Sequence, residues 1–361
     1  MEWVNWGHNQ RVTPLEPIRA HDVAQVQSVV TRAAREHRRV KVLGSGHSFT
    51  GIAVAEDIAL RLATPATLTV LDRRAGLVRV AAGMPLRVLN PLLWQLGLCM
   101  TNLGDIDAQT VAGAISTGTH GTGAHYRGLA DQVRGLDLVL ADGSHLRCSA
   151  EENAELFCFA RLGLGALGII VSVTLACEPA YYLHASEQSL PLDQVIDRID
   201  ELAETNDHFE FFWFPHTTIA ATKRNNRAAE QRANRGRAAE WIGDELLGNG
   251  AHELACRLGR RLPALVPRIN RTAAAAMSSG VYTDRAYKVF TSPRRVRFVE
   301  MEYAIPKAAV REALTELRRV AAAYARAVTF PVEVRFSAAD EVPLSTAHER
   351  DSAYLAVQVY R

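Results

Sequence analysis

The six residues Gly44-Ser45-Gly46-His47-Ser48-Phe49, which follow an apolar strand predicted over residues 40–43, say most about this chain. Two glycines let the backbone come close to a phosphate, and the amide groups of such a turn converge on its oxygens. A phosphate needs only these backbone donors, so the imidazole of His47 is better explained as a partner of another part of the same ligand. The loop therefore predicts a site for a phosphate-bearing ligand. A strand-to-turn glycine pair beside an incidental histidine is the alternative.

The glycine spacing excludes the better-known nucleotide-binding loops. The third glycine of a dinucleotide fingerprint would fall at position 49, which is Phe49, and no Gly-Lys-Ser/Thr ending follows. A G-x-G-x-x-G does occur at residues 163–168, but a predicted helix (153–159) precedes it and a predicted strand (169–176) follows it. A dinucleotide fingerprint needs the reverse order, so this match is rejected.

A second segment, residues 102–123, is rich in small residues and hydroxyl side chains. Such a chain packs close to a flat or extended ligand and offers backbone and hydroxyl donors along its length. The apolar stretch 111–115 favours burial of part of the run, whereas an exposed glycine-rich loop is the alternative. The segment reads Asn102-Leu103-Gly104-Asp105, then Val111-Ala112-Gly113, then Ser116-Thr117-Gly118-Thr119-His120-Gly121-Thr122-Gly123.

Together these segments resemble the PCMH-type FAD-binding domain of the vanillyl-alcohol-oxidase superfamily. Within it, the chain is most similar to the sugar-1,4-lactone oxidases, the group of the L-gulonolactone and D-arabinonolactone oxidases. The resemblance covers the whole chain and rests on many short motifs in the right order. They are Asn5-Trp6, Asn9, Gly-Ser-Gly-His-Ser at 44–48, Asn-Leu-Gly at 102–104, Val-Ala-Gly at 111–113, Thr-His-Gly-Thr-Gly at 119–123, Leu-Gly-Ile-Ile at 167–170, His208-Phe209-Glu210, Trp213, Pro215, Glu302-Tyr303, Ile305-Pro306 and Glu333-Val334-Arg335.

The resemblance implies an α+β protein of two domains. Residues 1–178 are expected to form the two-lobed FAD-binding domain, and residues 179–361 an α+β substrate (cap) domain with an antiparallel sheet. A length of 361 residues fits two domains. The family pattern continues to a His-Trp-Gly-Lys segment whose lysine joins the active site. This sequence contains no such segment, so the second domain is expected to be C-terminally incomplete.

The resemblance also implies FAD as the cofactor and His47 as its covalent attachment point, through the 8α carbon of the flavin. A neutral imidazole nitrogen is a good nucleophile near pH 7, which fits that role. The residues expected to bind the cofactor are Val42, Leu43, Gly44, Ser45, Gly46, His47, Ser48, Gly104, Asp105, Thr110, Gly113, Thr117, Gly118, Thr119, His120 and Ile170.

The catalytic prediction rests on residues 332–336. On a strand, Glu333 and Arg335 point to one face, while Val332, Val334 and Phe336 point to the other. A strand with apolar residues on one face and a carboxylate and a guanidinium on the other is suited to line a site for a polyol-like substrate. A surface ion pair on an edge strand is the alternative. The resemblance favours the first reading, because family members place this Glu and Arg against the substrate hydroxyl and the flavin.

The resemblance implies oxidation of an aldono-1,4-lactone, such as L-gulono-1,4-lactone, by hydride transfer to flavin N5. The product is a keto-lactone that tautomerises to an ascorbate-type ene-diol. Glu333 is expected to take the hydroxyl proton, and Arg335 to stabilise the developing negative charge. The electron acceptor is oxygen, a dye or a cytochrome. Gly104 favours oxygen, because the family position beside flavin C4a–N5 carries no side chain here. The alternatives are an alditol oxidase of the same superfamily and a truncated flavin-binding protein without turnover.

Composition bounds the remaining classes. The net charge is only +2, from 41 basic and 39 acidic residues, so the protein as a whole has no positive potential that would favour binding to nucleic acid or to an anionic membrane. The locally basic residues 223–237 are predicted to be an exposed helix or a connector. Five scattered cysteines without Cys-x-x-Cys spacing indicate reduced thiols and a cytoplasmic protein.

No metal site, signal peptide or membrane-spanning run is predicted. Some family members are membrane-bound, and the sequence leaves peripheral association open.

Periodicity predicts several elements around these motifs. Helices are expected at residues 22–35 with Asp22 as the cap, at 86–96, at 192–203 and from 308 to about 326. Hairpins are expected from strands 68–71 and 77–81, and from strands 136–140 and 145–148 around Asp142-Gly143. Further strands are expected at 209–214, 297–303 and 354–360.

Overall fold

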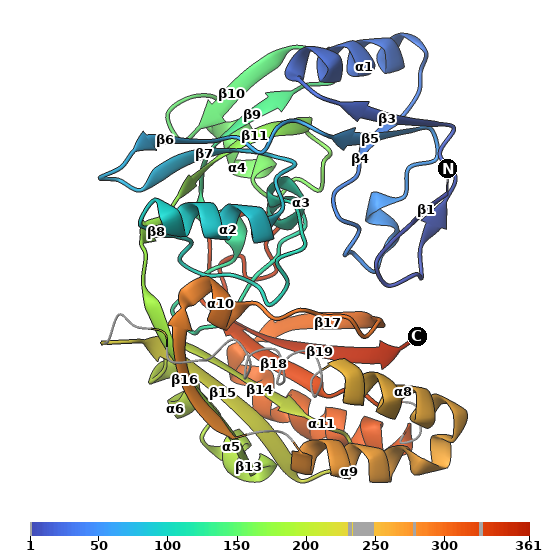
Figure 1. The fold of residues 1–361 in the computed structure, drawn as a ribbon, viewed down its shortest axis with the longest axis vertical. Helices are drawn as coiled ribbons and strands as arrows, with labels where there is room; N and C mark the ends of the chain where they lie inside the picture. The colour runs from blue at the N-terminus through green and yellow to red at the C-terminus, as the bar shows by residue number, and fades with distance from the viewer. Residues whose placement is uncertain (1, 230–232, 234–248, 277–278, 325–327) are drawn as a thin grey trace.

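A computed structural model describes the whole chain except residues 1, 230–232, 234–248, 277–278 and 325–327. The chain forms two lobes that meet along one face of a large sheet (Figure 1). The first lobe, at the top of that view, contains the N-terminus. The second contains the large sheet and the C-terminus, which lies at the side of this lobe that faces the first.

A three-stranded parallel sheet begins the first lobe. Its strands are β3 (Glu16–Ala20), β5 (Ile58–Leu62) and β4 (Val40–Val42), in that order. Helix α1 (Val23–Arg35) covers it, as predicted. Asp22 caps the helix by accepting a hydrogen bond from the backbone N–H of Gln25 at 2.8 Å. Because its apolar residues repeat at helical spacing, α1 buries Val26, Val29, Val30 and Ala33.

A five-stranded antiparallel sheet forms the rest of the first lobe, in the order β10-β9-β11-β7-β6. Both predicted hairpins lie in it and are confirmed: β6 (Leu68–Asp72) pairs with β7 (Leu77–Ala81), and β9 (Val133–Val139) pairs with β10 (His145–Ser149). Strand β11 (Ile169–Ala176) lies between the hairpins. The helices of this part are α2 (Leu86–Gln95), α3 (Val111–Ser116) and α4 (Ala154–Ala160); short elements are β1 (Trp3–Val4), β2 (Arg11–Val12), η1 (Gly51–Ala53), β8 (Leu98–Cys99), η2 (Leu129–Gln132) and β12 (Glu178–Pro179).

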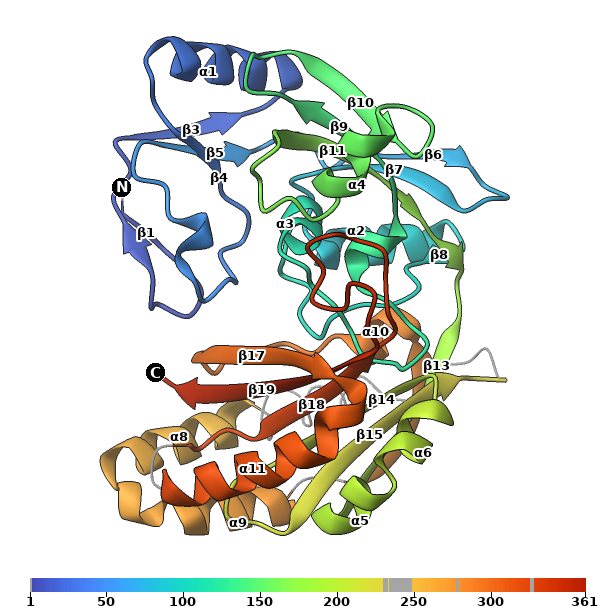
Figure 2. The same ribbon diagram turned by 180° about the vertical axis from the view of Figure 1, so that it is seen from behind.

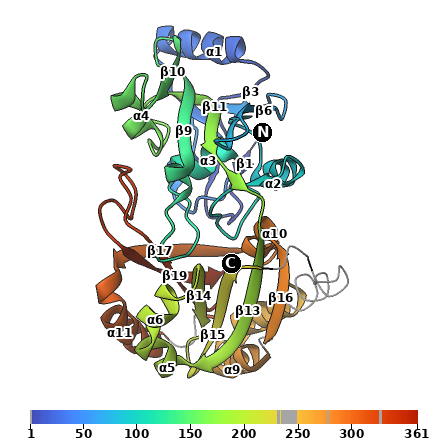
Figure 3. The same ribbon diagram turned by 90° about the vertical axis from the view of Figure 1, so that its left-hand side faces the viewer.

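The second lobe is built on a seven-stranded antiparallel sheet in the order β16-β13-β15-β14-β18-β19-β17. Helix α10 (Ala286–Phe290) lies between the lobes, and the other helices lie on the face turned away from the first lobe (Figures 2 and 3). The strands are β13 (Tyr182–Pro191), β14 (His208–Trp213), β15 (Ile219–Arg227), β16 (Gly280–Arg285), β17 (Phe298–Pro306), β18 (Val332–Ser337) and β19 (Ser352–Tyr360). The helices are α5 (Leu192–Asp197), α6 (Ile199–Glu204), α8 (His252–Arg261), η4 (Pro263–Leu265), α9 (Val266–Ala276), α10 (Ala286–Phe290), η5 (Lys307–Ala309) and α11 (Val310–Ala323). The predicted α+β class with an antiparallel sheet is confirmed.

Alternation along the central strands gives this sheet two different faces. Phe209 and Phe211 of β14 and Val334 of β18 belong to the apolar core under the helices. Glu333 and Arg335 alternate with that core and face the first lobe. One sheet therefore carries both the hydrophobic core of the second lobe and a polar wall toward the first.

Three predictions about the second lobe need correction. The helix expected over residues 192–203 is two helices, because Arg198 leaves the helical conformation between them. The helix expected from 308 begins as η5 and becomes α-helical only at Val310, and its predicted end falls on residues outside the described part. The basic segment 223–237 was predicted to be an exposed helix or a connector, but Lys223 to Arg227 belong to β15; residues 230–232 and 234–237 lie outside the described residues.

Among the residues that the structure describes, no helix is long and apolar enough to cross a membrane.

Candidate active site

The predicted cofactor loop lines a cavity of the first lobe. Strand β4 leads into it, α3 lies opposite, and the loop before β11 closes one side. Of the predicted cofactor residues, Val42 to Ser48, Thr110, Gly113, Thr117 and Ile170 lie in this lining. Further lining residues, which were not among the predicted cofactor residues, are Val40, Lys41, Ile52, Ala53, Leu62, Ala82, Gly83, Gln109, Ala112, Ser116, Leu164, Gly165, Gly168 and Ile169.

The glycines of the loop are required by close backbone approach. A Cβ at Gly44 would lie 2.8 Å from the Thr110 hydroxyl oxygen, and so would a Cβ at Gly113. Gly46 has φ +73°, a conformation that side-chain-bearing residues rarely adopt, and a Cβ there would meet Trp3 at 3.2 Å. The loop and the start of α3 thus form a close-packed cradle, in which a side chain at these positions would press on Thr110 or Trp3.

The N-terminal residues hold this loop in place, which explains the Asn5-Trp6 and Asn9 motif. The side-chain amide of Asn5 donates to the Ser48 carbonyl at 3.0 Å, and that of Asn9 donates to the Phe49 carbonyl at 2.6 Å. The backbone N–H of Trp6 donates to the Gly46 carbonyl at 2.7 Å. The start of the chain therefore holds the loop in place through these hydrogen bonds.

His47 fits the predicted attachment of a cofactor. Its Nδ1 atom is buried and has no hydrogen-bond partner among the described residues. The ring stacks on Trp6 with centroids 5.3 Å apart. Burial lowers the pKa of His47, with Asp105 acting in the opposite direction and Arg87 reinforcing the shift. The imidazole is therefore held neutral, with a free nitrogen, beside a glycine cradle, and these are the properties that a covalently held FAD requires.

The glycine run at 163–168 has a role that sequence reasoning missed. Helix α4 precedes it and β11 follows it, so rejecting it as a dinucleotide fingerprint was correct. Leu164, Gly165 and Gly168 nevertheless line the cavity. Gly168 has φ +139°, and a Cβ there would lie 2.9 Å from the Val139 carbonyl. The glycines of this run therefore line the same cavity, although the loop that carries them leads from a helix to a strand.

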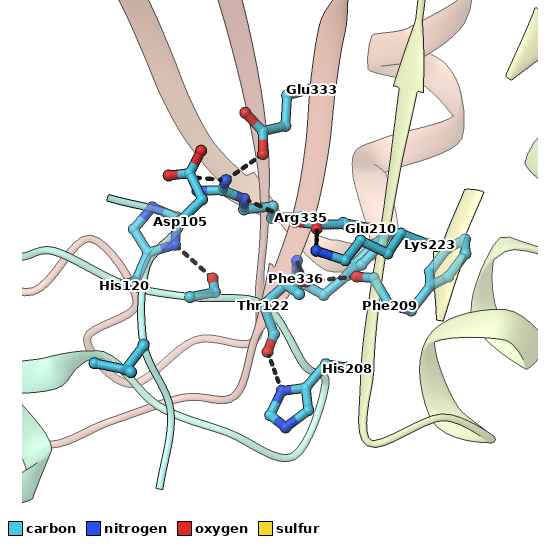
Figure 4. A network of polar contacts seen from close by, with 12 residues as sticks. Asp105, His120, Thr122, His208, Phe209, Glu210, Lys223, Glu333, Arg335 and Phe336 are labelled. Carbon is cyan, nitrogen blue, oxygen red and sulfur yellow. Dashed lines mark hydrogen bonds and ion pairs between the residues drawn. The ribbon is translucent and has the colours of Figure 1, made fainter. Parts of the chain in front are cut away.

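The other five predicted cofactor residues, Gly104, Asp105, Gly118, Thr119 and His120, lie outside this lining. Asp105 contacts Arg335 of the large sheet instead (Figure 4), and His120 contacts Glu302 of the same sheet.

Glu333 and Arg335 form a buried ion pair on β18, with only 3% and 8% of their surfaces exposed. The guanidinium also contacts Glu210 of β14, with Nε 3.2 Å from the carboxylate, and Asp105 of the first lobe, with Nη2 at 3.4 Å (Figure 4). Strand β18 lies between β14 and β19. The alternative of a surface pair on an edge strand is therefore wrong. Glu333 and Arg335 share one face of β18, as predicted, and this face is turned toward the first lobe.

Two further cations belong to this site, and no local sequence pattern indicates either of them. Arg294 donates to the Asp105 carboxylate at 2.6 Å. Lys223, from the segment predicted as a basic connector, lies with Nζ 3.6 Å from Glu210 and donates to the Val289 carbonyl at 3.0 Å. Burial alone would raise the pKa of Asp105, but Arg335 and Arg294 hold it below its ordinary value. Asp105 is thus an anionic bridge between the two lobes.

Two other carboxyl groups on this wall are shifted the opposite way. Burial, reinforced by Asp105 and Glu210, raises the pKa of Glu333 well above its ordinary value, although Arg335 opposes the shift. Burial together with Glu302 raises the pKa of Glu300 to about 7. The amide of Gln358 donates to Glu300 at 2.9 Å and to Glu333 at 3.5 Å. A raised pKa makes the Glu333 carboxylate a stronger base where it is ionised, and Arg335 favours that ionised form.

The Thr-His-Gly-Thr-Gly segment fastens the first lobe to this sheet. Thr122 donates its hydroxyl to the Phe209 carbonyl and accepts from the Phe336 backbone N–H at 3.2 Å. His208 Nδ1 donates to the Thr122 carbonyl at 2.7 Å, and burial lowers the pKa of His208 to about 4 (Figure 4). These contacts join both central strands, β14 and β18, to one short segment.

Comparison with known proteins agrees with this architecture. Residues 173–361 match the family model of D-arabinono-1,4-lactone oxidase, and residues 14–149 match that of an FAD binding domain. L-gulono-1,4-lactone dehydrogenase of Mycobacterium tuberculosis is 41% identical over 358 residues, which cover 99% of this chain and 83% of the relative. L-gulonolactone oxidase of Bos taurus is 33% identical over 367 residues, covering 100% of this chain and 82% of the relative.

A solved structure of a solvent-stable cholesterol oxidase superimposes with a TM-score of 0.83 over 99% of this chain and 79% of that one. Its sequence identity is 16%, so it shows the fold alone. The two family models and the two relatives show more. The chain belongs to the D-arabinono-1,4-lactone oxidase family and carries an FAD binding domain in its first lobe.

Proposed function

We propose that this protein oxidises a secondary alcohol of an aldono-1,4-lactone, with L-gulono-1,4-lactone as the first candidate, and that the product is a keto-lactone that tautomerises to an ene-diol. FAD, when bound, supplies the acceptor for the hydride. The printed names of two relatives, an L-gulono-1,4-lactone dehydrogenase and an L-gulonolactone oxidase, support this substrate class. The observation that carries the proposal is the buried Glu333–Arg335 pair facing the FAD-binding lobe.

The roles of the two side chains follow from their contacts. Glu333 takes the hydroxyl proton of the substrate while the carbon atom loses its hydride, so that a carbonyl group forms. Arg335 stabilises the negative charge that develops on the substrate oxygen. Glu210 contacts the Arg335 side chain at Nε, which fixes the direction of the guanidinium. The wall therefore pairs a proton acceptor with a fixed positive charge.

For the cofactor, we propose a covalent bond between His47 and the 8α carbon of FAD. The partner-free Nδ1 and the lowered pKa of His47 support this bond. Flavin should stay with the unmodified polypeptide after acid precipitation. His47→Ala should release it while some noncovalent binding remains, because the backbone of residues 44–48 still lines the cavity. Fully extractable flavin in the unmodified protein would refute the covalent bond without refuting FAD binding.

The electron acceptor belongs to the same proposal. The resemblance places residue 104 beside the flavin, and the lack of a side chain at Gly104 favours oxygen, with hydrogen peroxide as the product, over a dye or a cytochrome. We propose a cytoplasmic location from the reduced cysteines.

The test of the function is a substrate panel in which the FAD-loaded protein is mixed, without oxygen, with sugar lactones and with open-chain alditols. Bleaching of the flavin absorbance by lactones supports the proposal. Bleaching by alditols alone would assign the alditol oxidase alternative, and bleaching by neither would leave a flavin-binding protein without turnover.

A further inference from the structure

The contacts of His120 determine how many protons it shares with Glu302. His120 Nδ1 lies 2.8 Å from the Gly121 carbonyl oxygen, and Nε2 lies 3.1 Å from a carboxylate oxygen of Glu302. A carbonyl oxygen only accepts, so Nδ1 must carry a proton. A neutral ring would then present the lone pair of Nε2 to a carboxylate that also only accepts. The second contact is a hydrogen bond only if one additional proton lies between the two side chains.

The surroundings favour the carboxylate form of Glu302. Burial alone would raise the pKa of Glu302, but His120 and then Arg335 hold it below its ordinary value. The His120 ring stacks on Tyr354 with centroids 3.7 Å apart, and a cation over an aromatic face is favoured. His120 keeps 9% of its side-chain surface exposed and Glu302 keeps 27%, so water screens the pair only in part. A carboxylate of Glu302 therefore faces His120 across the junction of the lobes.

We propose that His120 and Glu302 hold one proton between them and that this dyad positions the FAD-binding lobe against the catalytic wall. The proton count stands on the two contacts alone, whereas the positioning role rests on the proposed function. The first lobe offers a base, His120, to an acid of the sheet, and an acid, Asp105, to a base of the sheet, Arg335. Because the first lobe supplies the base in one contact and the acid in the other, exchanging the two contacts would bring like charges together. The two contacts therefore favour one relative position of the lobes.

Backbone packing couples the two contacts. A Cβ at Gly121 would lie 2.3 Å from the Leu103 carbonyl and 2.4 Å from the Asn102 side chain. The segment that carries His120 therefore lies directly on the loop that carries Asp105. If the dyad loses its proton and opens, the position of Asp105 beside Arg335 is disturbed as well.

Loss of the proton leaves an unfavourable arrangement of charges. Glu302 then keeps a full negative charge close to Glu300 of its own strand and to Asp105 of the first lobe, with Arg335 as the cation that still acts on it. Tyr354, from β19, stacks on the imidazole but brings no charge in its ordinary protonated form. We therefore expect flavin reduction by the lactone to slow at alkaline pH.

The direct test is nitrogen NMR of the FAD-loaded protein labelled with 15N-histidine, in which His120→Gln assigns the signal. In the unmodified protein at pH 7, both ring nitrogens of His120 should be protonated. In Glu302→Gln, only Nδ1 should be protonated, because the new amide donates to Nε2. A neutral ring in the unmodified protein would overturn the proton count, whether or not the protein turns over a lactone.

The positioning role is tested by anaerobic flavin reduction between pH 6 and 10. His120→Gln should slow reduction about tenfold, and adding Glu302→Gln to it should recover most of the loss. Glu302→Gln alone should remove the alkaline fall. The matched control is His125→Gln in the pair with Glu204, where the two atoms are 3.3 Å apart but 60% and 46% of the side chains are exposed; it should match the unmodified protein. Equal rates and equal pH profiles in all these proteins would overturn the positioning role. If no lactone reduces the unmodified protein, the proposed function fails, and the NMR result still decides the proton count.

Discussion

Glu333→Gln should separate the chemistry of the site from its stability. Glutamine keeps the size and shape of the side chain, so the packing on β18 is preserved. The amide is no longer a base, and loss of a positioned general base costs about 10²- to 10⁴-fold in rate. This equals about 3–5 kcal/mol of transition-state stabilisation, at about 1.4 kcal/mol per tenfold change. FAD content should not change, because Glu333 lies outside the cavity lining.

The cost in stability should be much smaller. Arg335 keeps Glu210 at 3.2 Å and Asp105 at 3.4 Å, so its charge remains compensated after Glu333→Gln. We expect a loss of about 1 kcal/mol in the free energy of unfolding. Arg335→Ala, by contrast, should also slow reduction but leaves Glu333 and Glu210 facing each other without that cation. We expect it to cost about 3–5 kcal/mol in stability.

The assay is stopped-flow reduction of the bound flavin by lactone without oxygen, with flavin content and urea unfolding measured on the same samples. Glu210→Gln is the matched control, because it neutralises another buried carboxylate on the same guanidinium. It should slow reduction far less than Glu333→Gln. A Glu333→Gln rate within about threefold of the unmodified protein, or an equal loss in Glu210→Gln, would refute the role of Glu333 as the base.

Three further outcomes are expected. Gly46→Ala should lower FAD content, because φ +73° strains any side chain there; flavin absorbance per polypeptide measures this, and an unchanged ratio would contradict it. Gly104→Ala should slow reoxidation by oxygen and spare reduction, although its Cβ would lie 3.1 Å from the His120 carbonyl and 3.2 Å from Thr119; reduced flavin of the unmodified protein that persists in air would contradict this reading. The raised pKa of Glu300 means that the folded state binds its proton more tightly than the unfolded chain, so this group destabilises the fold increasingly from about pH 4.5 to about 7. Glu300→Gln should therefore raise the free energy of unfolding by about 3 kcal/mol at pH 8 and little at pH 4.5, and an equal effect at both pH values would argue against this assignment.

Local sequence patterns predicted the parts of the fold whose causes are local. The period of α1, its Asp22 cap and the Asp142-Gly143 turn depend on neighbours within a few residues, and all three lie where the pattern placed them. Alternation along β18 predicted that Glu333 and Arg335 share a face. The break at Arg198 had no comparable signal, because the apolar residues on both sides of it continue the helical pattern.

The missing parts of the site depend on contacts between distant segments. Arg294 lies 189 residues from Asp105 in the chain, and no local pattern indicates that the two meet. Lys223 looked like one of several exposed basic residues, because the sequence does not show that β15 carries it next to β14. His120 and Asp105 were assigned to the cofactor by resemblance. Only the packing of the two lobes reveals their contacts with the sheet.

Hydride transfer from a lactone carbon to bound FAD can be tested by an isotope effect on flavin reduction. The FAD-loaded protein is mixed without oxygen with L-gulono-1,4-lactone, either unlabelled or deuterated at the secondary alcohol carbon that becomes the carbonyl. We predict that both forms bleach the flavin, that the deuterated form does so several times more slowly, and that one keto-lactone forms per flavin reduced. Flavin that stays oxidised with both forms, in protein shown to contain FAD, would contradict the account.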